Sequence, residues 1–81
     1  MRSKEQAQQF ITNVLCGIWG RWQPQDFELA EWQRRLMPFD YDLAKDALAD
    51  FHFESQQRNI EPPAGKILNI LSKKARPKRN I

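Results

Sequence analysis

Cysteine, histidine and glycine are all scarce in this sequence. Its 81 residues include one cysteine, one histidine and three glycines. A single cysteine excludes a disulfide within the chain. Cys16 and His52 together fall short of the roughly four ligands that a common zinc site needs, so we expect no metal. Gly17, Gly20 and Gly65 form no phosphate-binding loop, so we expect no nucleotide or other cofactor.

Long apolar runs are missing as well. No run approaches the ~18–20 residues that a membrane-spanning helix requires. Residues 1–9 are too polar for a signal peptide. We therefore expect a cytoplasmic protein without a membrane contact.

The residues of a catalytic site are equally hard to assemble. Cys16 is expected on the polar face of the first helix, far in sequence from His52, and no motif of a Cys–His nucleophile surrounds it. The paired carboxylates fall on an exposed helix arc without a cleft, which gives no basis for acid–base catalysis. We interpret the chain as a binding protein rather than an enzyme, with Cys16 an inert, partly exposed thiol and His52 at the rim of the core.

The apolar residues that are present predict helices. They make up 41% of the chain, enough for a compact fold, and they recur at spacings of three and four. No segment alternates with period two for long enough to predict a strand. We predict an all-α domain of four helices over residues 1–75, with a flexible basic tail over 76–81. The predicted helices cover about 4–19, 25–37, 41–57 and 63–75.

The ends of these helices have recognisable sequence signals. Ser3 followed by Gln6 matches a capping box. Gly20 can take the left-handed conformation that ends the first helix. Asp40 is a typical N-cap for the third helix, and Pro63 suits the first position of the fourth.

Each helix has an apolar side that predicts the core, with Trp32 as its anchor. The expected inward residues are Ala7, Phe10, Ile11, Val14, Leu15, Ile18 and Trp22, then Leu29, Trp32 and Leu36, then Tyr41, Ala44, Ala47, Leu48 and Phe51, and finally Ala64, Ile67, Ile70, Leu71 and Ala75.

Charge is divided unevenly along the chain. Residues 1–60 carry seven Lys/Arg against nine Asp/Glu, a net charge of −2, whereas residues 61–81 carry six against one, a net charge of +5. The candidate anion-binding residues of this basic tail are Lys73, Lys74, Arg76, Lys78 and Arg79. No aromatic residue is interleaved for base stacking, so any nucleic-acid contact would be independent of base sequence. The tail can equally dock on an acidic protein or merely solubilise the chain.

A second candidate surface lies on the predicted helix 41–57. Four carboxylates repeat every four residues beside its core face, at Asp42, Asp46, Asp50 and Glu54. On a helical wheel Leu43 and Phe53 fall inside the same arc. An apolar pair rimmed by carboxylates suits a protein partner with a basic, apolar surface. The alternative is a solvated face with Leu43 and Phe53 covered by neighbouring helices.

The order of aromatic and proline residues resembles a known family. The residues concerned are Trp22-Gln23-Pro24, Glu31-Trp32, Leu36, Phe39-Asp40-Tyr41-Asp42, Ala44, Ala47, Leu48, Pro62-Pro63 and Ile67. Over about residues 5–75 this pattern is similar to the helical domain of the phage replicative-helicase loader and inhibitor family. The resemblance implies a small non-enzymatic phage or prophage protein that binds a hexameric replicative helicase, holds it inactive and delivers it to an origin complex. In that family a segment after the helical domain makes much of the helicase contact, and it corresponds here to Lys73–Ile81.

Three functions are therefore compatible with the sequence. The leading hypothesis is a replication adaptor that binds a helicase through the basic tail, the acidic arc or both. The second is a DNA-binding accessory protein that uses the tail alone. The third is a phage inhibitor of an unrelated host protein. The sequence leaves the oligomeric state open.

Overall fold

A computed structural model describes residues 1–55 and 60–76 of the chain. The helical elements are α1 (Lys4–Phe10), η1 (Ile11–Leu15), α2 (Cys16–Ile18), α3 (Asp26–Leu36), α4 (Tyr41–Ser55) and α5 (Ala64–Lys74). Because α1, η1 and α2 follow one another without a break, they correspond to the single first helix that the sequence predicts. The described part of the chain contains no strand, which confirms the predicted all-α domain of four helices.

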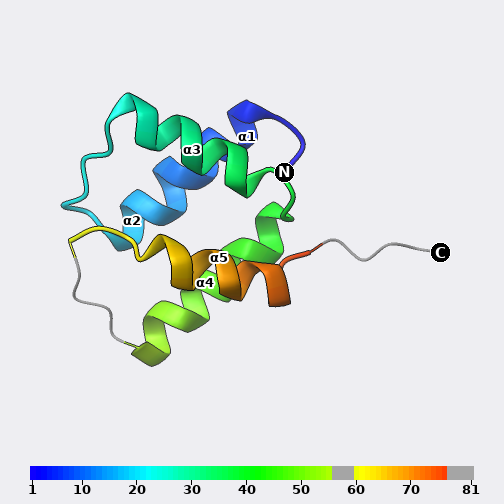
Figure 1. Ribbon diagram of the computed structural model, residues 1–81. Helices are drawn as coiled ribbons and strands as arrows, with labels where there is room; N and C mark the ends of the chain where they lie inside the picture. Colours follow the sequence, from blue (N-terminus) through cyan, green and yellow to red (C-terminus); the bar gives the residue numbers. More distant parts are fainter. Residues whose placement is uncertain (56–59, 77–81) are drawn as a thin grey trace.

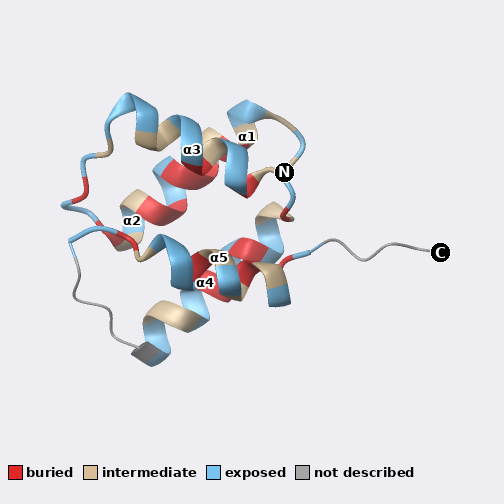
Figure 2. Cartoon of the chain, in the orientation of Figure 1, coloured by how far each residue is buried: buried red, intermediate tan, exposed pale blue. Residues whose placement is uncertain are grey.

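Two pairs of neighbouring helices build the core (Figure 1). α1 packs against α3, α4 packs against α5, and a further contact between α1 and α4 joins the pairs. Figure 2 shows that the buried residues lie along the sides where these helices face one another. The largest fully buried side chains are Phe10, Ile11, Leu15, Leu36, Leu48, Ile67 and Leu71, and all belong to the predicted inward faces. Of the helices described, none is long and apolar enough to cross a membrane.

Trp32 is a core anchor, as predicted. It is 7% exposed, and its ring meets that of Trp22 edge to face with the centroids 6.0 Å apart. The rings of Phe10 and Tyr41 form a similar contact, with the centroids 5.4 Å apart. Aromatic pairs of this geometry add about 0.5–1.5 kcal/mol to the free energy that burial of the rings provides.

Side chains cap two helices where the sequence predicts it. Ser3 Oγ accepts a hydrogen bond from the Gln6 backbone N–H at 3.1 Å. The return bond differs from a standard capping box, because Gln6 Oε1 accepts from the N–H of Arg2 rather than that of Ser3. Asp40 Oδ2 accepts from the Leu43 N–H at 2.9 Å and so caps α4.

Two predicted helix ends are wrong in detail. The first helix ends at Ile18, and Trp19 already leaves the helical conformation with φ −105° and ψ 71°. Gly20 is therefore not needed as a left-handed cap, and its φ lies outside the left-handed region. Pro63 is the N-cap residue and Ala64 the first residue of α5, so Pro63 does not occupy the first helical position.

The predicted ends of the third helix, at 56–57, and of the tail, at 77–81, lie outside the described residues.

A π-helical turn in the first helix was not predicted. The Cys16 N–H donates to the Ile11 carbonyl, five residues back, rather than to the residue four back. A π turn holds more residues per turn than an α turn, so it displaces every later residue on the helical wheel. Cys16 is consequently half-buried against the core instead of on the polar face, and Trp19 is buried at 3% exposure.

Other departures from the predicted core are smaller. Ile18, Leu29, Tyr41, Phe51 and Ile70 are only half-buried, although all five pack against the core. Ala64, the first residue of α5, is exposed, which contradicts its predicted inward position.

Candidate functional site

The candidate site lies on the outer side of α4. Ala44, Ala47 and Leu48 hold the inner side of this helix in the core, with at most 5% of any of them exposed. The opposite side carries six residues that we call the α4 face: Asp42, Leu43, Asp46, Asp50, Phe53 and Glu54. All six are exposed.

The two apolar residues of the α4 face are not covered by neighbouring helices. Leu43 is 42% exposed and Phe53 is 85% exposed, which contradicts the alternative of a solvated face with both side chains tucked away. Most apolar side chains of the same helix are at least half-buried, so the exposure of Phe53 is a local feature. A phenylalanine ring left in water gives up about 1.5–3 kcal/mol of burial free energy.

The carboxylates of the α4 face stabilise α4 poorly. Lys45 is the only Lys or Arg in residues 41–55, so the segment has a net charge of −3. Like charges four residues apart repel by a few tenths of a kcal/mol. Asp42 lies in the first turn, where the helix dipole favours an anion, but Glu54 lies at the opposite end, where the dipole disfavours one. Taken together, the four carboxylates lower the stability of α4.

A shallow apolar groove adjoins Phe53. It measures about 460 Å³ and is lined by Asn13, Val14, Gly17, Ile18, Lys45, Ala49, His52 and Phe53. The groove runs between α4 and the η1–α2 part of the first helix. Gly17 leaves one wall open, since a Cβ built there would meet no atom within 4 Å, and the short Ala49 side chain contributes to the opposite wall. The sequence does not predict this groove, because the groove depends on the register between two helices.

His52 is half-buried at the edge of this groove, in keeping with its predicted place at the rim of the core. Its ring lies 6.4 Å from that of Trp19 in an edge arrangement. His52 Nδ1 and Trp19 Nε1 are both buried, and neither has a hydrogen-bond partner among the described residues.

Cys16 has the properties of a structural thiol. Partial burial raises the pKa of its thiol above the ordinary value, which lowers the fraction of reactive thiolate. Over residues 1–55 and 60–76, no three His, Cys, Asp or Glu side chains gather in a way that could hold a metal ion.

The basic end of the chain begins at the same corner of the fold as α4. Lys73, Lys74 and Arg76 are exposed at the end of α5. The carbonyl of Ala75, between them, accepts a hydrogen bond of 2.8 Å from the N–H of Asp40, the residue before α4. The other two candidate anion-binding residues, Lys78 and Arg79, lie outside the described residues.

Comparisons of the chain with protein-family models, with curated proteins and with solved structures find no match. The resemblance to the helicase loader and inhibitor family therefore stays a prediction from the sequence. What the residues and their geometry support is an exposed acidic–apolar surface beside a groove, with a cationic surface next to it.

Proposed function

We propose that this domain is a non-enzymatic adaptor that binds a protein partner through the α4 face. The partner surface would carry apolar side chains for Leu43 and Phe53 and cationic side chains for the surrounding carboxylates. Following the sequence resemblance, the proposed partner is a replicative helicase, which the protein loads or inhibits in phage or prophage replication.

The exposure of Phe53 is the observation that carries this proposal. Aromatic side chains that become buried at the centre of an interface often provide most of its binding energy, while the charged rim contributes less. Phe53 also forms one side of the groove between α4 and the first helix, so a partner side chain can contact the ring and the groove together. The carboxylates around it would mainly accelerate association and select a basic partner.

Surface plasmon resonance with immobilised protein and the host replicative helicase tests the role of Phe53. Phe53→Ala should raise the dissociation rate about ten- to a hundredfold, which corresponds to losing about 1.5–3 kcal/mol of burial. Phe27→Ala is the matched control, because Phe27 is 67% exposed on α3, away from the α4 face. Equal effects of the two substitutions would contradict the proposed interface.

Charge reversal distinguishes the role of the carboxylates from that of Phe53. Asp46→Lys with Asp50→Lys should slow association by about tenfold at low salt and leave dissociation nearly unchanged. The control is Glu5→Lys, which reverses an exposed carboxylate on α1. If salt and these reversals leave the association rate unaltered, the carboxylates do not face the partner.

The identity of the partner is tested by binding and then by unwinding of a forked DNA. A loader or inhibitor should bind the helicase at micromolar concentration or below and change its unwinding rate. Absence of binding by the folded protein would exclude the helicase and favour the third hypothesis, inhibition of an unrelated host protein.

Sequence-independent DNA binding is the second candidate, supported by the exposure of Lys73, Lys74 and Arg76. If all five tail cations neutralise phosphates, the logarithm of the affinity should fall with the logarithm of salt concentration at a slope of about −4.5. Replacing these five cationic residues by glutamine should abolish DNA binding. The replacement leaves the fully buried Ala75 in place. Binding that survives this replacement would exclude the tail as the DNA contact.

A further inference from the structure

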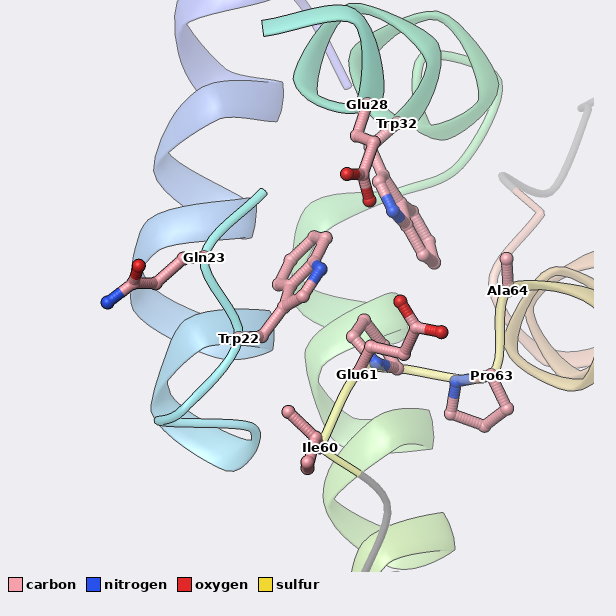
Figure 3. Close-up of a pocket in the computed structure, with 9 residues that line it drawn as sticks. Trp22, Gln23, Glu28, Trp32, Ile60, Glu61, Pro63 and Ala64 are labelled. Atoms are coloured by element: carbon pink, nitrogen blue, oxygen red, sulfur yellow. The ribbon is translucent and has the colours of Figure 1, made fainter. Parts of the chain in front are cut away.

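A second and larger hollow lies away from the α4 face (Figure 3). It measures about 970 Å³ and opens between the loop after α2, the α3 helix and the segment that leads into α5. Its lining residues are Trp22, Gln23, Glu28, Trp32, Ile60, Glu61, Pro62, Pro63 and Ala64. We call this hollow the tryptophan cleft.

Two indole rings line the tryptophan cleft. Trp22 and Trp32 meet at an interplanar angle of 73°, and each is 7% exposed. Pro62 and Pro63 also line the cleft, as does Ile60, which is 65% exposed. Because only a small part of each ring is accessible, the cleft suits the end of one side chain rather than a flat ligand stacked on a whole ring.

The charged groups that the described residues contribute to the tryptophan cleft are both carboxylates. Among the described residues that line it, Glu28 and Glu61 are the only ionisable ones. In Figure 3 the carboxylate of Glu28 lies beside the Trp32 ring on the side of Trp22, and that of Glu61 lies between the Trp32 ring and Pro63. Glu28 already accepts a hydrogen bond from the Gln25 N–H at the start of α3, but at 3.4 Å this contact is long and occupies one oxygen.

We propose that the tryptophan cleft binds an arginine side chain of a protein partner. A guanidinium is planar and weakly hydrated, so it can lie against an aromatic ring and donate to carboxylates at the same time. Attraction between a cation and an indole contributes about 0.5–1 kcal/mol at exposed sites and more where water is excluded. The two carboxylates disfavour an anionic ligand, and a purely apolar ligand would leave their charge partly desolvated without compensation.

The proposal depends on residues separate from the α4 face, so it stands or falls independently of the proposed function. A cleft of tryptophan and proline residues is also a plausible receptor for a proline-rich peptide. Charge distinguishes the two occupants, because only arginine gains from Glu28 and Glu61.

Nuclear magnetic resonance of the indole N–H groups provides the test. The probes are three capped pentapeptides with arginine, citrulline or proline between glycine pairs, since citrulline has nearly the shape of arginine without its charge. The arginine peptide should shift the Trp22 and Trp32 signals saturably, with an affinity at least about tenfold above those of the other two peptides. Trp19 is an internal control, because it does not line the cleft and its signal should stay in place.

A paired substitution checks the carboxylates. Glu28→Gln with Glu61→Gln should weaken arginine binding about tenfold or more, and glutamine at position 28 still fits the capping box. The control pair, Asp42→Asn with Glu54→Gln, removes the same charge from the α4 face and should leave the affinity unchanged. Equal binding of the citrulline or proline peptide, an unaffected double variant, or no indole shift at about 10 mM arginine peptide would each overturn the proposal.

Discussion

The helices α3 and α4 place similar residues on their outer sides and use them differently. Each carries one strongly exposed phenylalanine, Phe27 on α3 and Phe53 on α4. On α3 both arginines are paired, since Glu31 forms ion pairs with Arg34 at 2.9 Å and with Arg35 at 3.1 Å. Acidic residues also lie in its first turn and arginines in its last, as the helix dipole favours.

The outer side of α4 lacks this internal compensation. Within the described residues both ion pairs belong to α3, and the carboxylates of α4 recur at a spacing where they repel one another. An outer side that stabilises its own helix needs no further explanation. One that weakens its helix, and also exposes Leu43 and Phe53, is better explained by a binding role, and this difference is our reason for preferring α4 to α3 as the interface.

The largest expected effect tests the inner side of α3 against its outer side. Trp32→Ala should destabilise the domain by about 3–5 kcal/mol and unfold most of it, because a domain of this size has little stability to lose. Phe27→Ala on the same helix should change the free energy of unfolding by less than about 0.5 kcal/mol. Thermal denaturation followed by circular dichroism measures both. A Trp32→Ala protein with an unchanged melting temperature would contradict the described core.

The next effect tests the inner side of α4. Ala44 is fully buried, so Ala44→Leu should force neighbouring helices apart and cost about 1–3 kcal/mol. Ala30→Leu on α3 is the matched control, because Ala30 is exposed and its replacement should be nearly neutral. Urea denaturation gives both values. If Ala44→Leu proves as harmless as the control, α4 is packed less closely than the structure indicates.

The sequence was sufficient to predict the helices and most of the core, because the spacing of Phe10, Leu15, Leu36, Leu48 and Leu71 reflects which side each helix buries. The sequence was not sufficient at the first helix. There a π turn changes how the spacing of residues along the chain relates to the direction in which their side chains point. Because of that turn, the sequence spacing predicts Cys16 on the polar face and does not predict Trp19 in the core.

The candidate sites also differ in whether regular helical spacing is enough to predict them. The α4 face could be predicted because its residues lie on one regular helix, where spacing alone determines direction. The groove at Gly17 and the tryptophan cleft could not, because each joins segments far apart in sequence, such as Trp22 and Pro63. No sequence periodicity encodes how such segments meet.

A smaller effect compares the carboxylates of the two helices directly. Asp50→Asn should stabilise the domain by a few tenths of a kcal/mol, because it removes repulsion from the acidic residues four positions away on either side. Glu31→Gln should act in the opposite direction, because it removes the ion pairs with Arg34 and Arg35. Urea midpoints at low salt measure the two changes. The same sign for both would show that the helices do not differ in the way that we describe.

The smallest effect is the pH dependence of the α3 ion pairs. Hydrogen bonds from Arg34 and then from Arg35 lower the pKa of Glu31 below its ordinary value of about 4.5. The folded state therefore holds the Glu31 proton less tightly than the unfolded chain, and the stabilisation is fully present above pH 4.5 and disappears as the pH falls through the lowered pKa. Glu31→Gln should therefore lower the urea midpoint slightly at pH 7 and have almost no effect at pH 2.5. Glu5→Gln, without an arginine partner in the described structure, is the control. A difference between wild type and Glu31→Gln that stays constant across this range would show that the pairs with Arg34 and Arg35 contribute nothing to stability in solution.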